Sequence, residues 1–205
     1  EVITFIDILE CVFLEIGEQV LLGNEDCQFG YRDSVFKHAL ANKVLITHVN
    51  FKLPKHYELE TSYGELAALT EPTPEKVYSK VIEIRKSKLP DPAELGNAGS
   101  FFKNPVVRTE VAERLKAEFP EMPTYADGAR IKLAAGWMID HLGLKGHQVG
   151  GFSVHNRQAL VLTNDGTGNA DDLRELVALV RSSVKATFGL SLAVEPTQLG
   201  HFNRA

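Results

Sequence analysis

The sequence is poor in cysteine, has no excess of positive charge and contains no long apolar run. Its two cysteines, Cys11 and Cys27, are too few for a disulfide framework and lack the spacing of metal ligands, which fits a reducing cytoplasm. A formal net charge of −5 argues against general electrostatic binding to nucleic acids or membrane surfaces. No stretch of about 18 apolar residues is present to span a bilayer. We therefore expect an ordinary globular, cytoplasmic protein that binds neither nucleic acid nor membranes and holds no metal.

The beginning of the chain lacks three further features. It has no initiator methionine, no basic start and no small-residue cleavage site, so the N-terminal segment is not a signal peptide. Residues 2–9 instead have the apolar character of a strand that already lies inside a sheet. We therefore expect a fragment whose front half is missing.

Two regions in the first half of the chain have the pattern of β-strands. Residues 2–22 contain two β-rich runs on either side of a turn at residues 15–18. Residues 44–53 alternate with the period of two that is typical of a strand, and Pro54 ends the run. Both regions predict sheet rather than helix.

Helices and further strands are predicted beyond residue 70. Thr73 can cap the first helix, Pro74 fits its first turn, and the two prolines in residues 89–92 indicate a linker or domain boundary. The later elements are a helix capped by Thr109, a helix at residues 131–142, a strand pair at residues 148–154 and 159–163, a helix from Asn169 to Gly189, and a last strand at residues 190–194. Together they predict a mixed α+β fold of two layers.

Residues 96–105, Gly-Asn-Ala-Gly-Ser-Phe-Phe-Lys-Asn-Pro, are the most informative segment of the chain. Small residues before Ser100 let the backbone run close to a ligand, and Pro105 stops regular structure. Ser100 is not in a Gly-x-Ser-x-Gly turn and has no His-Asp partner order, which disfavours acyl chemistry. Two roles stay open: a proton donor or ligand-binding hydroxyl, and a loop serine that bonds local backbone.

Two charged residues outside this segment each have a structural and a functional interpretation. Arg32 can form a surface ion pair with Asp33 or Glu25, or its guanidinium can grip a carboxylate at two points. Glu195 follows a predicted apolar strand. Its carboxylate is either exposed at the end of this strand, or it lies near the core and acts as an acid or an electrostatic partner. The sequence leaves these alternatives open.

Basic and aromatic side chains offer contacts to a diphosphate, because lysine binds phosphate as a point charge. The candidates are Arg85, Lys88, Lys103 and Asn104. For Arg85 and Lys86, a solvated helix end is the favoured interpretation. Tyr63 and Tyr125 lie in predicted loops, where a tyrosine can close over a ligand or cover the edge of a core.

Seven stretches, in order along the chain, together resemble one enzyme family. They are residues 29–37 (FGYRDSVFK), 61–66 (TSYGEL), 88–92 (KLPDP), 96–105 (GNAGSFFKNP), 132–137 (KLAAGW), 154–161 (VHNRQALV) and 192–196 (LAVEP). The chain resembles the C-terminal portion of UDP-N-acetylenolpyruvoylglucosamine reductase (MurB), the flavoenzyme family of bacterial peptidoglycan precursor synthesis. The stretch around Tyr63 makes it similar to the type whose tyrosine covers the substrate.

The resemblance implies a domain organisation and a set of ligands. Residues 1–89 would be the C-terminal part of an FAD-binding, PCMH-like subdomain, residues 90–190 an α+β substrate-binding domain, and residues 191–205 a C-terminal strand and tail. The implied cofactors are FAD and NADPH, and the implied substrate is UDP-N-acetylglucosamine enolpyruvate. The complete enzyme, a UDP-N-acetylmuramate dehydrogenase, would be cytoplasmic and monomeric.

The resemblance also implies roles for single residues. In the family, NADPH reduces FAD, and the reduced flavin delivers a hydride to the enolpyruvyl group to give UDP-N-acetylmuramate. Arg32 and Glu195 would polarise the substrate carboxylate and stabilise the developing enolate, and Ser100 would donate a proton to the adjacent carbon. The implied substrate-binding positions are Tyr63, Lys88, Asn104, Tyr125 and Gln158.

Two features depart from the family pattern. The Gly-rich pyrophosphate loops that form most of the family's flavin site are absent from the chain, so no cofactor-binding residue is assigned. Residues 197–205 differ from the strand that usually follows the Glu-Pro pair. The alternative to a reductase is therefore a flavin-free UDP-sugar-binding fragment without activity.

Overall fold

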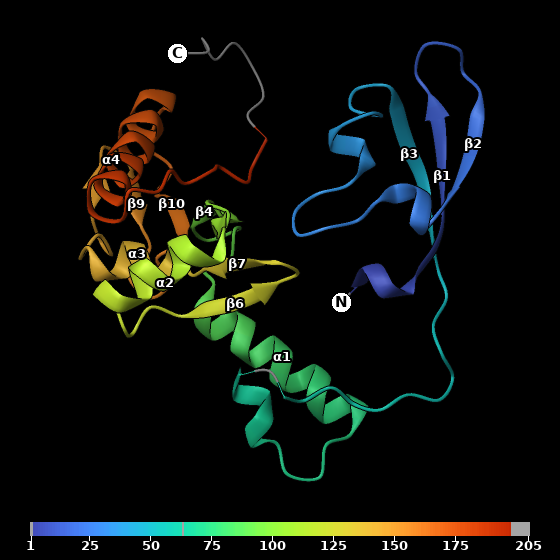
Figure 1. The fold of residues 1–205 in the computed structure, drawn as a ribbon, viewed down its shortest axis with the longest axis horizontal. Coiled ribbons are helices and arrows are strands. Elements are labelled where there is room, and N and C mark those ends of the chain that lie inside the picture. Colours follow the sequence, from blue (N-terminus) through green and yellow to red (C-terminus); the bar gives the residue numbers. More distant parts are fainter. Residues whose placement is uncertain (1, 63, 198–205) are drawn as a thin grey trace. The chain divides into compact units, whose positions relative to one another are not determined.

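The structure, a computed structural model, describes residues 2–62 and 64–197. The chain divides into two compact units, Glu1–Leu59 and Glu60–Ala205, which we describe one at a time (Figure 1). Tyr63, the expected substrate-covering tyrosine, lies outside the described residues. Within the described part of the chain, no helix is long and apolar enough to cross a membrane.

The first unit is a three-stranded antiparallel sheet in the order β2-β1-β3. Its strands are β1 (Ile6–Phe13), β2 (Gln19–Gly23) and β3 (Val44–Phe51). Gly17, with φ at +71°, forms the turn between β1 and β2, and its N–H donates to the carbonyl of Phe13 at 2.8 Å. Glycine takes this left-handed conformation without the strain that a Cβ would cause. The hairpin and the strand predicted from residue 44 onwards are therefore confirmed.

The strand predicted from residue 2 is wrong for its first four residues. Val2–Phe5 forms a 3-10 helix, η1, and the strand begins only at Ile6. The amide of Asn24 explains this start, because its Nδ2 donates to the carbonyls of Ile3 at 2.7 Å and Ile6 at 2.9 Å. A side chain from the next loop thus satisfies carbonyls that a strand partner would otherwise have to satisfy.

The core of the first unit is small and includes both cysteines. Leu9 and Cys11 of β1 are buried together with Cys27. Burial raises the pKa of both thiols, so neither is a ready nucleophile at neutral pH. Two short 3-10 helices connect β2 to β3: η2 (Glu25–Cys27) and η3 (Val35–Lys37).

The second unit begins with η4 (Gly64–Ala68) and the helix α1 (Pro74–Lys88). As predicted, Thr73 caps α1, since its Oγ1 accepts a hydrogen bond from the N–H of Lys76 at 3.3 Å. The helix ends just before Pro90, where a continued helix would lose a donor. No side chain of α1 is fully buried, so most of the stabilisation of this unit comes from the elements that follow.

Two antiparallel sheets and three helices form the body of the second unit. One sheet has the order β4-β10-β9-β8 and the other the order β5-β7-β6. The strands are β4 (Gly96–Ser100), β5 (Val106–Val107), β6 (Thr124–Asp127), β7 (Arg130–Leu133), β8 (Gln148–Val149), β9 (Phe152–Val154) and β10 (Val161–Asn164). The helices are α2 (Thr109–Glu118), α3 (Ala135–His141) and α4 (Ala170–Phe188). The expected mixed α+β class is confirmed.

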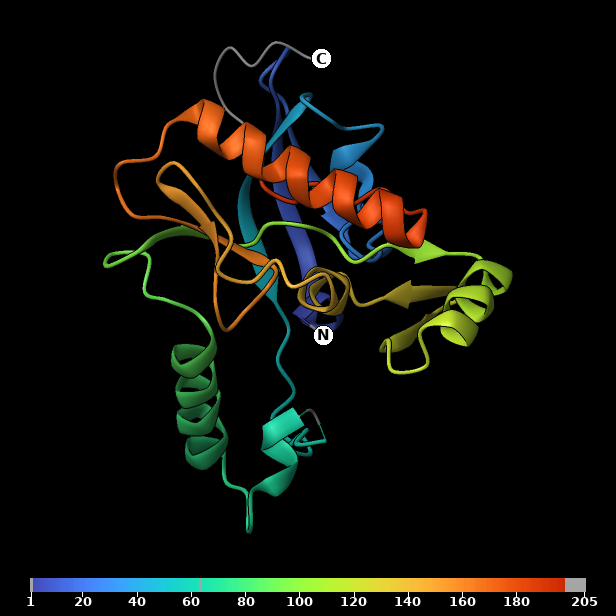
Figure 2. The same ribbon diagram turned by 90° about the vertical axis from the view of Figure 1, so that its left-hand side faces the viewer.

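The hydrophobic core of this unit lies between α4, α3 and the sheets, and α4 crosses the sheet that contains β9 and β10 (Figure 2). Leu176, Val180 and Val184 of α4 have no exposed surface. Burying a side chain of this size contributes about 1.5–3 kcal/mol each. Phe188 adds an aromatic contact, since its ring centroid lies 4.8 Å from that of Phe119. The predicted apolar face of this helix is thus the main anchor of the unit.

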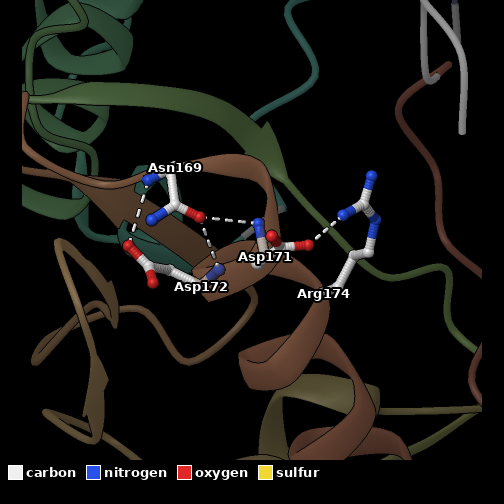
Figure 3. A network of polar contacts seen from close by, with 4 residues as sticks. All are labelled: Asn169, Asp171, Asp172 and Arg174. Atoms are coloured by element: carbon white, nitrogen blue, oxygen red, sulfur yellow. Dashed lines mark hydrogen bonds and ion pairs between the residues drawn. The ribbon is translucent and has the colours of Figure 1, made fainter.

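The start of α4 is fixed by reciprocal hydrogen bonds between Asn169 and Asp172 (Figure 3). The Asn169 Oδ1 accepts from the N–H of Asp171 at 2.8 Å and of Asp172 at 3.2 Å, and the Asp172 Oδ2 accepts from the N–H of Asn169 at 3.0 Å. Arg174 then pairs with Asp171. The cap predicted at Asn169 is confirmed, and Gly189 ends the helix in the left-handed conformation, with φ at +71°.

Three predictions for the second unit are corrected. The helix predicted at residues 131–142 starts only at Ala135, because Ile131 and Leu133 alternate inward in a hairpin with β6. Thr109 is the first helical residue rather than the cap, and no side chain caps α2. The strand predicted at residues 190–194 is reduced to one bridge between Val194 and Phe102. In each case the error concerns where an element starts or ends, which tertiary pairing decides.

Candidate active site

Ser100 is the last residue of β4, at the edge of its sheet. It pairs with Val161 of β10, and the N–H of the following residue, Phe101, donates to the carbonyl of Leu160 at 2.7 Å. Phe101 and Phe102 are buried, with ring centroids 5.3 Å apart in an edge-to-face arrangement. Two aromatic side chains in the core thus hold the backbone that carries the serine. The small residues in the segment 96–105 indicate a loop. Its first half is instead the strand β4.

The Ser100 side chain is half-exposed and forms no hydrogen bond with another described residue. Neighbouring Gly99 has φ at +69°, and a Cβ built there would meet no atom within 4 Å. Open space therefore lies beside the backbone next to the hydroxyl. This arrangement speaks against the alternative in which Ser100 serves only to bond local backbone.

Glu195 lies beside the residue that follows Ser100. Its N–H donates to the carbonyl of Phe101 at 2.9 Å, and the N–H of Lys103 donates to the carbonyl of Ala193 at 2.8 Å. These two bonds flank the bridge between Phe102 and Val194. The C-terminal segment is thereby fixed along residues 101–103, and the half-buried Glu195 is brought near the end of β4.

Arg32 belongs to the first unit, where the backbone has an unusual conformation. Its φ is +53°, its carbonyl accepts a hydrogen bond from the Lys37 Nζ at 2.6 Å, and its guanidinium carbon lies 5.7 Å from the centre of the Tyr31 ring. Asp33 accepts from His38 Nε2 at 2.7 Å and from the N–H of Ser34 at 2.9 Å, and the bond from His38 is the main cause that lowers the pKa of Asp33. The convergence of Arg32 with Ser100 and Glu195 stays a prediction.

Asn104 and Gln158 lie close to the first residues of α3. The Asn104 Oδ1 accepts from the N–H of Ala135 at 3.0 Å. A Cβ at Gly136 would lie 3.9 Å from the Gln158 Oε1, so this amide faces the next residue of the helix. Two expected substrate-binding residues, 54 positions apart in the sequence, thus meet at one turn of the chain.

Tyr125 and Lys88 occupy more exposed positions. Tyr125 is 51% exposed on β6 and pairs with Lys132 of β7, whose Nζ lies 6.0 Å from the centre of the tyrosine ring. Lys88, at the end of α1, forms an ion pair with Glu65 at 3.0 Å. Lys132 was not predicted as a site residue; it lies in the central strand of its sheet and pairs in register with Val106 of β5 and Tyr125 of β6.

The described residues contain no group of three or more His, Cys, Asp or Glu side chains that could hold a metal ion. The chemistry available from the second unit is therefore that of a hydroxyl, a carboxylate and several amides and cations. A flexible hydroxyl beside open space and a carboxylate fixed through its backbone are suited to binding and protonating a polar ligand. By its fold, the second unit is a mixed α+β domain of antiparallel sheets covered by helices.

Comparison with known proteins identifies the family. The family model described as UDP-N-acetylenolpyruvoylglucosamine reductase, C-terminal domain, matches residues 91–199. Among curated proteins, the UDP-N-acetylenolpyruvoylglucosamine reductase of Chromobacterium violaceum is 50% identical over 188 residues, which are 88% of this chain and 55% of that protein. The enzyme of the same name from Vibrio vulnificus strain YJ016 is 45% identical over 197 residues, 95% of this chain and 56% of that protein. The chain belongs to the UDP-N-acetylenolpyruvoylglucosamine reductase family.

A solved structure supports the fold. The crystal structure of UDP-N-acetylenolpyruvylglucosamine reductase (MurB) from Thermus caldophilus matches with a TM-score of 0.58 at 24% sequence identity, over 94% of this chain and 52% of that one. The chain spans about half the length of the curated relatives it matches. The family resemblance inferred from the seven sequence stretches is therefore confirmed, whereas the individual site roles and the division at residues 89 and 190 remain predictions.

Proposed function

We propose that the complete protein reduces the enolpyruvyl group of UDP-N-acetylglucosamine enolpyruvate to give UDP-N-acetylmuramate, as a cytoplasmic monomer. The observation that supports the proposal is the backbone hydrogen bond from Glu195 to Phe101, which brings residue 195 next to the residue that follows Ser100. Membership of a reductase family favours this function over that of an inert UDP-sugar-binding fragment. FAD and NADPH belong to the proposal as the cofactors of the complete protein.

The open space at the end of β4 supports the placement of a flat redox cofactor there. Open space beside Gly99 leaves room for a ring system against the backbone, next to the proton donor. When bound, FAD reduced by NADPH would supply the hydride to the terminal carbon of the enolpyruvyl group. The flavin's diphosphate loops would come from the part of the relatives that this chain does not match.

Ser100 is the proposed general acid. Its hydroxyl is a weak acid in water, so it can act only on a strongly basic carbon placed within hydrogen-bond reach. Glu195 and Arg32 are proposed to polarise the substrate carboxylate, on which negative charge develops as an enolate. Preorganised charge of this kind is often the largest contribution to catalysis, because it needs no reorganisation during the reaction.

Asn104, Gln158, Tyr125 and Lys88 are proposed to bind the nucleotide part of the substrate, with Tyr63 covering it. The hydrogen bond from the N–H of Ala135 supports this for Asn104, since a hydrogen-bonded amide presents its remaining group in a set direction. The amide of Gln158 lies close to Gly136 at the same helix start. Remote contacts of this type position the reacting carbon rather than touch it. Substitutions there should therefore raise KM more than they lower kcat.

Ser100→Ala in the complete protein tests the proposal. Stopped-flow absorbance should show flavin reduction by NADPH at the normal rate, and product formation should fall by about 10²–10⁴-fold, the range of a lost general acid. Ser182→Ala, on the exposed side of α4, is the matched control and should change neither half-reaction. Normal product formation by the Ser100 variant would exclude Ser100 as the acid.

A further inference from the structure

Strand β4 contains a β-bulge immediately before Ser100. Ser100 pairs with Val161 of β10. Asn97 pairs with Thr163, so β4 has two residues between these pairs where β10 has one. Gly99, the residue just before the serine, has a left-handed φ of +69°. An extra residue of this kind bends its strand and is a recurring means of aiming a side chain next to an active site.

The extra residue decides the face of the sheet on which Ser100 lies. Paired residues share a face, and successive residues of a strand alternate between the two faces. Leu162 packs in the hydrophobic core that α4 anchors, so Val161 and its partner Ser100 belong to the opposite face. Without the bulge, Ser100 would shift by one position and point to the core side, where a hydroxyl without a partner is costly. The bulge therefore keeps the hydroxyl out of the core.

The side chain of Asn97 holds this bulge. Its Oδ1 accepts from the N–H of Gly99 at 3.0 Å, the bond to the second residue onward that asparagine forms in turns. Its Nδ2 donates to the carbonyls of Leu95 at 2.9 Å and Pro90 at 3.2 Å. These bonds account for the oxygen and both N–H groups of the amide, and they assign its orientation. One side chain thus joins the residue before Ser100 to the segment that follows α1.

The partners of Asn97 and the residue after Ser100 are fixed as well. The N–H of Leu95 donates to the carbonyl of Asp91 at 2.9 Å, which closes a turn ahead of β4. On the other side of the serine, the buried Phe101 donates its N–H to the carbonyl of Leu160 at 2.7 Å. Packing therefore maintains the backbone after Ser100, whereas the amide of Asn97 maintains the backbone before it.

We propose that Asn97 is a positioning residue for proton transfer, because it holds the bulge of β4 that directs the Ser100 hydroxyl to the reacting carbon. The inference rests on the proposed function, in which Ser100 is the general acid. Asn97 acts through Ser100, since its own polar groups are bonded to backbone. A weak acid depends on close placement, and a displacement of about 1 Å can cost about 10²-fold in rate.

Stopped-flow absorbance of two variants of the complete protein tests the proposal. Asn97→Ala should leave flavin reduction by NADPH at the normal rate and slow product formation by about 10–10²-fold, because the serine would be misplaced. Asn97→Asp loses the two donors but keeps an oxygen that accepts from Gly99, so most of the lost rate should return. Recovery by Asp is expected of a residue that holds the bulge.

Asn164→Ala is the matched control. Asn164 lies on β10 of the same sheet, and its Oδ1 accepts from the N–H groups of Gly166 at 2.9 Å and Gly168 at 3.1 Å. Its removal breaks comparable bonds in the loop that follows β10. We expect the control variant to have a lower thermal unfolding temperature and two normal half-reactions.

A double-mutant cycle shows whether the effect passes through the serine. In a Ser100→Ala background, Asn97→Ala should cause no further loss of product formation. The proposal would be overturned by normal product formation in Asn97→Ala, by equal slowing of both half-reactions, by no recovery in Asn97→Asp, or by an undiminished effect in the Ser100→Ala background. Failure of the proposed function is a separate result, because it appears as normal product formation by Ser100→Ala alone.

Discussion

The N–H of Glu195 donates to the carbonyl of Phe101 at 2.9 Å, and through this bond the C-terminal segment follows the residues just after Ser100. Residues 94 positions apart are therefore joined through their main chains. Backbone hydrogen bonds are insensitive to the identity of the side chains that they connect. Beside these hydrogen bonds, the contribution to docking that depends on a side chain is the packing of Leu192, which is 1% exposed.

We expect Leu192→Ala to destabilise the second unit by about 2–5 kcal/mol, the usual cost of a cavity left by a buried leucine. In the complete protein the same change should lower kcat, because Glu195 would lose its fixed position. Chemical denaturation and steady-state kinetics measure the two effects. Ser191→Ala, at the exposed preceding residue, is the control and should change neither. A destabilised but fully active Leu192→Ala enzyme would contradict a role for the docked segment in catalysis.

Gly151→Ala should destabilise the protein by at least about 2 kcal/mol, as overpacking of a tight contact does. A Cβ at Gly151 would lie 2.1 Å from the backbone nitrogen of Gly168, and neither main chain can move without disturbing the start of α4. The thermal unfolding temperature is the measurement. Gly128→Ala is a useful comparison, because a Cβ there meets only open space and costs about 1–2 kcal/mol of left-handed strain. Equal losses of thermal stability for the two variants would show that the chain around Gly151 relaxes to make room for the added Cβ.

Stability should fall as pH is lowered through the range just below 6.5, and His155 should account for part of the fall. The folded protein lowers the pKa of His155, mainly through burial, so in this range the unfolded chain binds more protons than the folded one. The contribution of His155 to stability is thus present above the pKa of about 6.5 that it has in the unfolded chain, and it decreases as the pH falls towards the lower pKa of the folded protein. Urea unfolding at several pH values measures it. His155→Gln should flatten the curve, whereas the same change at exposed His147 should leave the slope of the curve intact.

The local features of the fold could be predicted from the sequence where one short pattern decides the structure. Thr73 and Asn169 cap their helices, Gly189 ends α4, and the strand predicted at residues 44–53 matches β3, because each signal acts within a few residues. The boundary at Ala135 could not be predicted. The apolar residues before it fit a helix as well as a strand, and only pairing with β6 decides between them.

The candidate site could be predicted as a set of residues but not as an arrangement. The resemblance selected Ser100, Glu195, Asn104 and Gln158, and the structure adds which backbone groups bind Glu195 and Asn104. Arg157 lies in one of the seven matching stretches, but its proximity to the end of α1 could not be predicted, because that proximity depends on the tertiary fold.

Asn104 is hydrogen-bonded to the first residue of α3, and Gln158 lies beside the second, so two proposed substrate-binding residues border one short helix. Met138 and Ile139, on the inner side of that short helix, have no exposed surface. A change of volume beneath them would shift the N–H of Ala135 and with it the amide of Asn104. If the proposed function holds, substitution of either interior residue during evolution would change the affinity for the nucleotide sugar without any direct contact.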